Sequence, residues 1–315
     1  MIRQIRGLLA GLLMMATAFS TAPVFAQNGA QNAAQSSARN AVQSAAKVRK
    51  PLFWKATSPT ATVYLMGSIH VGDSSMYPLS DAVETAFAGS KVLAVEVNLK
   101  NIDQSRSLKL VQEYGLYTGD DTLSNHISKE TAASLIEFCD KAGFPMAAFD
   151  KLKPWVAAVT VLAITLKAAG EEPALGIDQH FLDESKAQRI DELESAEYQL
   201  SLFSAASDQE QQELLAVTLS QVEKTKEFMQ KMQDAYLSGD AEKLLAVIHE
   251  QDTLPKMLRK KLIDDRNVSM AEKVEGYLKG NEPVFVVVGA AHIIGDTGIV
   301  KLLKAKGYKV EQVAK

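Results

Sequence analysis

Apolar and polar positions form blocks that predict strands near both ends of the chain. Short runs rich in β-branched and aromatic residues predict strands at 53–56, 62–66, 91–97, 283–289 and 308–313. The turn-forming Thr57-Ser58-Pro59-Thr60 lies between the first two runs and predicts a hairpin. Apolar residues at helical spacing predict helices at 79–87 and 299–306. Each end of the chain therefore predicts a strand–helix–strand unit.

The middle of the chain has mainly helical spacing. The predicted helices cover 154–166, 207–232, 241–249 and 254–278. The first is apolar almost all round but too short to cross a bilayer, so it predicts a buried core helix. Ser207-Asp208-Gln209-Glu210 has the pattern of a capping box and opens the second. One short strand is predicted at 188–193, although Asp and Glu disfavour strands.

The amino terminus has the pattern of a secretory signal peptide. Arg3 and Arg6 precede an apolar run at 8–19, and the small-residue site Val24-Phe25-Ala26 follows. The run is shorter than the roughly 20 residues of a membrane span, so cleavage after Ala26 is expected rather than an uncleaved anchor. The expected organisation is a signal peptide at 1–26, a disordered tether at 27–50 and one domain at 51–315. We expect an exported protein, periplasmic or secreted, without a membrane span in its mature form.

Composition narrows the classes of partner and metal site. The chain has 47% hydrophobic and 23% charged residues, which is the balance of a globular protein. With 34 Lys and Arg against 38 Asp and Glu and no long basic run, a nucleic-acid partner is not expected. Cys139 is the one cysteine, so an intramolecular disulfide and a cysteine metal cluster are excluded. Any metal site must use histidine, carboxylates and water.

Two predicted strands end in the same motif. Gly67-Ser68-Ile69-His70 and Gly289-Ala290-Ala291-His292 both follow an apolar strand, and Gly-Asp follows each histidine within a few residues. Ligands of open α/β sheets bind beyond the carboxyl ends of the strands, so both histidines are expected at one site, with Glu96 at the end of the next strand. Two imidazoles and a carboxylate are a common ligand set for a divalent metal, which predicts metal-assisted hydrolysis.

These motifs also predict the fold class. We expect an α/β (α+β) fold with a mixed central sheet. Its two strand–GxxH–helix–strand halves are flanked by helices, and a mainly helical segment lies between them.

The paired motifs resemble those of the TraB/PrgY/GumN family, which includes the Tiki proteases. The resemblance includes Leu93-Ala94-Val95-Glu96-Val97-Asn98 after the first motif and covers roughly 52–313. Further matching segments are Gly176-Ile177-Asp178-Gln179, Leu193-Glu194-Ser195 with Gln199, and Asp265-Arg266-Asn267. Erythromycin-esterase and ChaN-like proteins are more distantly similar. Tiki members are metal-dependent proteases with two essential GxxH histidines and a glutamate, so the resemblance implies these roles for His70, His292 and Glu96.

The resemblance also draws attention to four other residues. Glu194 follows a predicted strand, as Glu96 does, and is expected to be a second ligand, a general base or a partner that orients a histidine. Arg266 is expected to stabilise an oxyanion or bind a substrate carboxylate, with a helix salt bridge as the alternative. Asp178 is expected to cap or buttress the site, and Asn267 to hydrogen-bond in the same cluster.

The leading hypothesis is an exported metal-dependent peptidase that uses Mn, Co or Zn. Its substrate would be a peptide or another component of the cell envelope. One alternative keeps the centre but changes the substrate to an ester or a glycan linkage. Another is a non-catalytic envelope protein that binds heme, iron or a signalling peptide, with Tyr77 or a histidine as iron ligand. The sequence predicts no particular oligomeric state.

Several other residues are assigned no chemistry. His126, His180 and His249 lack the paired motif and a strand-end position. Ser68 is not expected to be a nucleophile, because it is not in a Gly-x-Ser-x-Gly elbow and the second motif has Ala290 at its position.

The signal peptide gives the first testable prediction. If the chain is exported, mature protein recovered from the cell envelope or medium should begin at Gln27. Amino-terminal sequencing or intact-mass measurement checks this. A mature protein that still begins at Met1 would contradict the expected cleavage.

Overall fold

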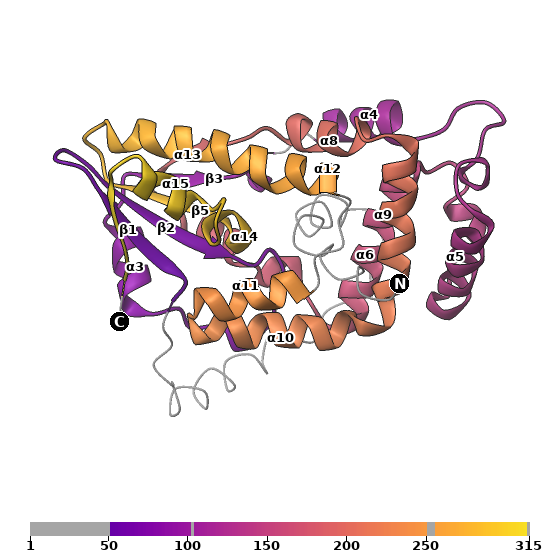
Figure 1. Cartoon of the computed structure of the whole chain (residues 1–315), viewed down its shortest axis with the longest axis horizontal. Coiled ribbons are helices and arrows are strands. Elements are labelled where there is room, and N and C mark those ends of the chain that lie inside the picture. The colour runs from indigo at the N-terminus through magenta and orange to yellow at the C-terminus, as the bar shows by residue number, and fades with distance from the viewer. Residues whose placement is uncertain (1–50, 102–103, 251–255, 314–315) are drawn as a thin grey trace.

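The strands form one mixed sheet in the computed structural model, which describes residues 51–101, 104–250 and 256–313 (Figure 1). The predicted signal peptide and the whole predicted tether lie outside the described residues. The strands are β1 (Phe53–Thr57), β2 (Thr62–Ser68), β3 (Val92–Val95), β4 (Arg189–Glu192), β5 (Val284–Gly289) and β6 (Lys309–Gln312). Their order in the sheet is β4-β3-β5-β2-β1-β6. The predicted hairpin is confirmed as β1 and β2, and the predicted strand in the helical middle as β4.

The order of the strands places β5 between β2 and β3. β5 pairs in parallel with both, β3 pairs in parallel with β4, and β1 pairs antiparallel with β2 and β6. The mixed sheet is therefore confirmed, with β1 running against the other five strands. Since β4, β3, β5 and β2 are parallel neighbours, their carboxyl ends meet along one edge of the sheet.

The helices fill most of the remaining chain. They are α3 (Asp81–Ala88), α4 (Gln104–Gly115), α5 (Lys129–Ala142), α6 (Pro154–Ala169), α7 (Ile177–Glu184), α8 (Ala196–Ser204), α9 (Asp208–Gln221), α10 (Thr225–Ser238), α11 (Ala241–Glu250), α12 (Lys256–Arg259), α13 (Asp265–Leu278), α14 (Ala290–Ile293) and α15 (Ile299–Ala305). No helix among the described residues is long and apolar enough to span a membrane.

Two predicted helices differ from the structure in their interiors. The capping box of Ser207 and Glu210 is confirmed, but the single helix predicted over 207–232 is wrong, because a tight turn at Val222–Lys224 separates α9 from α10. Such a 3₁₀ turn keeps nearly helical spacing and needs no glycine or proline, so periodicity does not reveal it. The helix predicted over 254–278 contains a π-helical segment, Lys260–Asp264, between α12 and α13.

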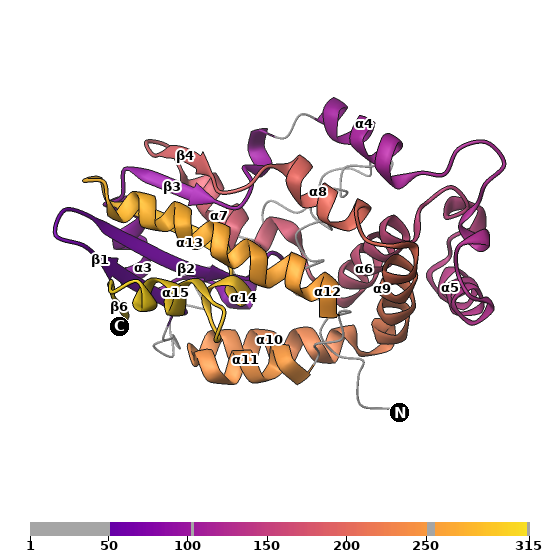
Figure 2. The same cartoon turned by 45° about the horizontal axis from the view of Figure 1, so that its top comes forward.

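Helices cover both faces of the sheet (Figure 2). On one face, Phe285 of β5 packs against Phe87 of α3 and Phe181 of α7, with ring centroids 5.4 and 4.8 Å apart. On the other face, α13 packs against β2 and α15. Both faces of β5 are therefore covered, which explains why all of its residues are buried.

The helical segment is built on α6. Pro154 begins this helix and Gly170, at φ 91°, ends it, and most of its side chains are buried, which confirms the predicted core helix. α6 packs against α9 and α10. α10 in turn reaches the sheet, because the Tyr236 hydroxyl donates to the Gly67 carbonyl at 2.7 Å. The helical segment is thus tied to the first GxxH motif.

Glu171 forms a second tie between α10 and the first motif. Its carboxylate oxygens accept from Gln233 Nε2 at 2.9 and 3.1 Å, and its side chain is 7% exposed. The adjacent Glu172 exchanges two backbone hydrogen bonds with Gly72. Burial and the nearby Asp73 charge raise the pKa of Glu171 to about 7.

This raised pKa predicts how stability changes with pH. Since the folded chain holds the Glu171 proton more tightly than the unfolded chain, its contribution is present below about pH 4.5 and is lost as pH rises to about 7. Glu171→Gln should reduce the loss in the free energy of unfolding between pH 5 and pH 8 by on the order of 1–3 kcal/mol, because the Gln side chain can accept from Gln233 without carrying a charge. Urea unfolding at pH 5 and pH 8 measures it.

Glu172→Gln is the matched control, because its side chain is exposed and its backbone contacts with Gly72 are retained. An equal slope in the Glu171→Gln and unmodified proteins would contradict the assignment.

Candidate functional site

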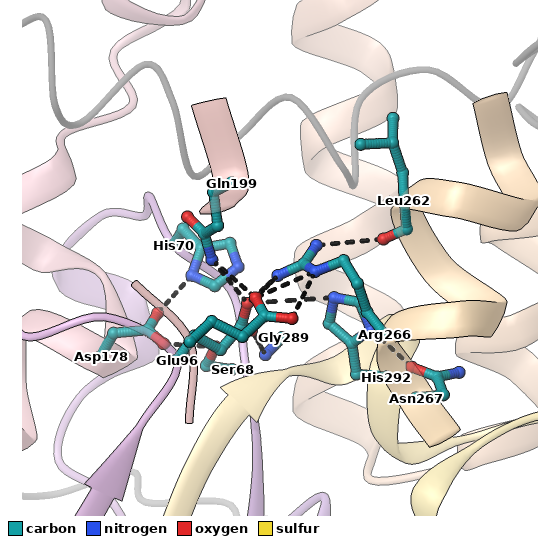
Figure 3. A network of polar contacts seen from close by, with 11 residues as sticks. Ser68, His70, Glu96, Asp178, Gln199, Leu262, Arg266, Asn267, Gly289 and His292 are labelled. Atoms are coloured by element: carbon teal, nitrogen blue, oxygen red, sulfur yellow. Dashed lines mark hydrogen bonds and ion pairs between the residues drawn. The ribbon is translucent and has the colours of Figure 1, made fainter. Parts of the chain in front are cut away.

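One candidate residue follows each of the four parallel strands β4, β3, β5 and β2, at the same edge of the sheet. Glu194 follows β4, Glu96 follows β3, His292 lies on α14 after β5, and His70 follows β2. Backbone pairing continues past the strand ends, where the Glu194 N–H donates to the Glu96 carbonyl at 2.8 Å. The structure therefore brings both GxxH histidines and both glutamates together. Figure 3 shows His70, Glu96 and His292 side by side.

His70 is oriented by a carboxylate. Its Nδ1 lies 2.6 Å from Oδ2 of Asp178, which is at the start of α7, and the Ser68 hydroxyl donates to the other Asp178 oxygen at 2.9 Å. Nδ1 is thus the protonated nitrogen, and Nε2 of the neutral ring keeps its lone pair. Gly176 is required beside the motif, because a Cβ there would lie 2.4 Å from the His70 carbonyl oxygen. Asp178 therefore buttresses His70.

His292 is oriented by a neutral amide. Its Nδ1 lies 2.6 Å from Asn267 Oδ1, and the Asn267 Nδ2 donates to the Thr297 carbonyl at 2.9 Å. Because Nδ2 is used by Thr297, the amide oxygen is the atom that faces the ring. His292 therefore also donates through Nδ1 and keeps the lone pair on Nε2. All three of these residues belong to the carboxyl-terminal part of the chain.

Gly289 leaves a small space on which three side chains converge. A Cβ at this position would lie 3.0 Å from His70 Nε2, 3.4 Å from Glu96 Oε1 and 3.5 Å from His292 Cδ2. The Gly289 N–H also donates to Glu96 Oε1 at 2.7 Å. The missing side chain thus creates the room at the centre of the site.

Arg266 lies between the two glutamates and is 3% exposed. Its Nη2 donates to Glu96 Oε2 at 2.5 Å and to Glu194 Oε2 at 2.7 Å, while Nε contacts both Glu194 oxygens at 3.0 Å. Nη1 donates to the Leu262 carbonyl, and Gln199 donates to Glu194 Oε2 at 3.1 Å. The guanidinium is directed at the glutamates, and its expected role with an oxyanion stays a prediction.

The two histidines titrate in opposite directions. Burial disfavours protonation of His70, but the charge and hydrogen bond of Asp178 outweigh it and raise the pKa. Burial, followed by the positive charge of Arg266, lowers the pKa of His292 well below its ordinary value. Burial also raises the pKa of Glu96, although Arg266 opposes this shift. The charge of the Nδ1 partner therefore distinguishes the histidines.

The donor set fits a divalent metal in its chemistry. Both histidines have Nδ1 held by an acceptor, the usual arrangement of metal-binding imidazoles, and Glu96 Oε2 lies 3.9 Å from His292 Nε2. Within the described ranges, no group of three or more His, Cys, Asp or Glu residues already has the arrangement of a metal site. His70, His292 and Glu96 are the residues that could hold the ion, with Asp178 and Asn267 behind them.

The other histidines and Tyr77 lie in different surroundings. His126 pairs with Asp121 and His180 with Glu84, while His249 lies in the last turn of α11. The Tyr77 hydroxyl donates to the carbonyls of Leu175 and Gly176.

Ser68 was assigned no chemistry from the sequence, but its hydroxyl supports Asp178, the carboxylate that orients His70. Ser68 and His70 are two residues apart at the end of a strand, and this spacing on an extended chain is the signal that places both on one face.

Comparison with known proteins finds a family and several relatives. The model of the TraB/PrgY/gumN family matches residues 52–312, which include every residue of the site. The uncharacterized protein YbaP of Escherichia coli (strain K12) is 24% identical over 247 residues, covering 76% of this chain and 87% of that protein. An uncharacterized protein of Treponema pallidum (strain Nichols) is 22% identical over 274 residues, covering 82% of this chain and 81% of that protein. No solved structure matches significantly.

The Nδ1 partners of the two histidines differ in charge, so swapping these charges should shift the two histidine pKa values in opposite directions. In metal-free protein, Asp178→Asn should lower the pKa of His70 by about one unit or more, because Asp178 makes the largest contribution that opposes burial. Asn267→Asp should raise the pKa of His292 by a similar amount. NMR titration of the ring resonances measures both. Unchanged values in either variant would contradict the assignment of these partners.

Proposed function

This chain belongs to the TraB/PrgY/gumN family, and we propose that it is an exported metal-dependent hydrolase whose substrates are peptides of the cell envelope. The observation that carries the proposal is the pair of imidazoles, each fixed through Nδ1, that converge with Glu96 on the space over Gly289. Such a pair, with a carboxylate, is a ligand set that leaves positions open for water and substrate. The peptide substrate and the export rest on the resemblance and on the amino-terminal pattern.

His70, His292 and Glu96 would hold a divalent ion, with Mn, Co and Zn as the candidates. When bound, such an ion activates water and polarises a carbonyl group. Asp178 and Asn267 hold the Nδ1 protons, so that both rings present Nε2 to the centre. The Gly289 N–H fixes Glu96 Oε1 and keeps the carboxylate beside both rings.

Glu194 would accept a proton, and Arg266 would stabilise negative charge. Glu194 is a second buried carboxylate beside Glu96, and we assign it the role of general base that takes a proton from water. Arg266 bridges both glutamates and would supply positive charge to a developing oxyanion. Gln199 donates to Glu194 and orients it.

Gly289→Ala is the sharpest test of the centre. The methyl group would lie 3.0 Å from His70 Nε2, while the backbone at φ −49° and ψ 136° suits alanine, so the fold should persist and the centre should be filled. We expect near-stoichiometric metal in the unmodified protein and at least a tenfold weaker affinity in the variant. Elemental mass spectrometry after loading with Mn²⁺, Co²⁺ or Zn²⁺ measures this, beside turnover of fluorogenic peptides.

Gly276→Ala on α13 is the matched control, because a Cβ there meets nothing within 4 Å. It should keep metal and turnover, with helix stability slightly increased. Equal metal in the Gly289→Ala and Gly276→Ala proteins, or none in the unmodified protein, would contradict a metal centre. Hydrolysis of esters or glycans instead of peptides would keep the centre and change the substrate. Metal binding without turnover of any of them would favour a binding protein.

A further inference from the structure

Arg266 holds the two glutamates unequally. Three of its contacts go to Glu194, whereas Glu96 receives one, from Nη2 to Oε2 at 2.5 Å. Nη1 also donates at 3.0 Å to the carbonyl of Leu262, which lies in the π-helical segment one turn before Arg266. The guanidinium is therefore anchored by Glu194 and Leu262 without Glu96.

The Glu96 oxygen that accepts a hydrogen bond from Arg266 also faces His292. Glu96 Oε2 lies 3.9 Å from His292 Nε2, while Oε1 is occupied by the Gly289 N–H. A cation bound by His292 and Glu96 would therefore share this carboxylate with the guanidinium. Two cations at one buried carboxylate repel each other, since the interior screens charge weakly.

We propose that Arg266 competes with the divalent metal for Glu96 and thereby sets the metal affinity of the site. The inference rests on the proposed function and adds the regulation of its centre. In metal-free protein, Arg266 neutralises the buried Glu96 carboxylate. When metal binds, Glu96 is shared with the ion and Arg266 stays on Glu194. By linkage, the contact that stabilises the metal-free form lowers metal affinity by the same factor.

A purely structural role for Arg266 predicts the opposite result. If the guanidinium only held Glu96 in position for the metal, its removal would leave the carboxylate less ordered and would weaken metal binding. The direction of the change in affinity therefore separates competition from support.

The experiment compares Zn²⁺ affinity in the unmodified protein and in Arg266→Met, by competition with a fluorescent chelator. Removal of one positive charge beside a divalent ion should tighten Zn²⁺ binding by roughly tenfold or more. The metal-free variant should also melt at lower temperature, because Glu96 and Glu194 then lose the positive charge they share, and Zn²⁺ should restore more of this loss than in the unmodified protein. Equal or weaker Zn²⁺ binding in the variant would overturn the inference.

Arg189→Met is the matched control. Arg189 also lies between two carboxylates, Asp191 and Glu282, but its side chain is 56% exposed and lies at the far end of β4. Its removal should leave Zn²⁺ affinity unchanged. An increase in affinity as large as that of Arg266→Met would show that only the net charge of the protein matters, and would overturn the inference.

Further outcomes keep this inference separate from the proposed function. If Arg266→Met does not fold, Arg266→Lys retains the charge on Glu194 without the fork that reaches Glu96, and it should tighten Zn²⁺ binding by a smaller factor. Unchanged or weaker binding in this variant would overturn the inference. Zn²⁺ binding in the unmodified protein without a gain in either variant overturns the competition alone, whereas no binding in any of them overturns the metal centre as well.

Discussion

A carboxylate that is 3% exposed must be compensated inside the protein, and Glu96 receives its compensation from separate parts of the chain. The Gly289 N–H comes from β5 and the Arg266 guanidinium from α13, while Gln199 on α8 approaches the same carboxylate at 3.5 Å. Leaving this charge unpaired would cost several kcal/mol, so the three elements are held in one arrangement. The positions of the two histidines depend on this arrangement, because Gly289 both begins the turn to His292 and leaves room for His70.

Much of the fold could be predicted from the sequence, because strands, turns and helix caps are local. Apolar runs located the strands, and the capping box located the start of α9. The insertion of β5 between β2 and β3 could not be predicted, since strand order depends on pairing between residues more than 180 positions apart in sequence, for which no local pattern exists. The break between α9 and α10 was also hidden, because its tight turn preserves helical spacing.

The candidate site divides in the same way. The duplicated GxxH motif and its strand-end position were enough to predict that His70, His292 and Glu96 share one edge of the sheet. The partners of these groups were harder to predict, because Asp178 and Arg266 reach them from helices in the middle and near the end of the chain. Ser68 was given no role from the sequence, because the second motif has alanine at its position. The two halves thus share a backbone plan but differ in the charge that each histidine meets.

The central place of β5 has a consequence for the order in which the protein is assembled. β2 and β3 are separated by only the α3 connection, yet they touch through a strand that is synthesised some 190 residues later. The amino-terminal half of the sheet cannot close before this strand arrives, so the nascent chain keeps unpaired strand edges through most of its synthesis. The sheet of this protein is therefore completed only when nearly the whole chain has been synthesised.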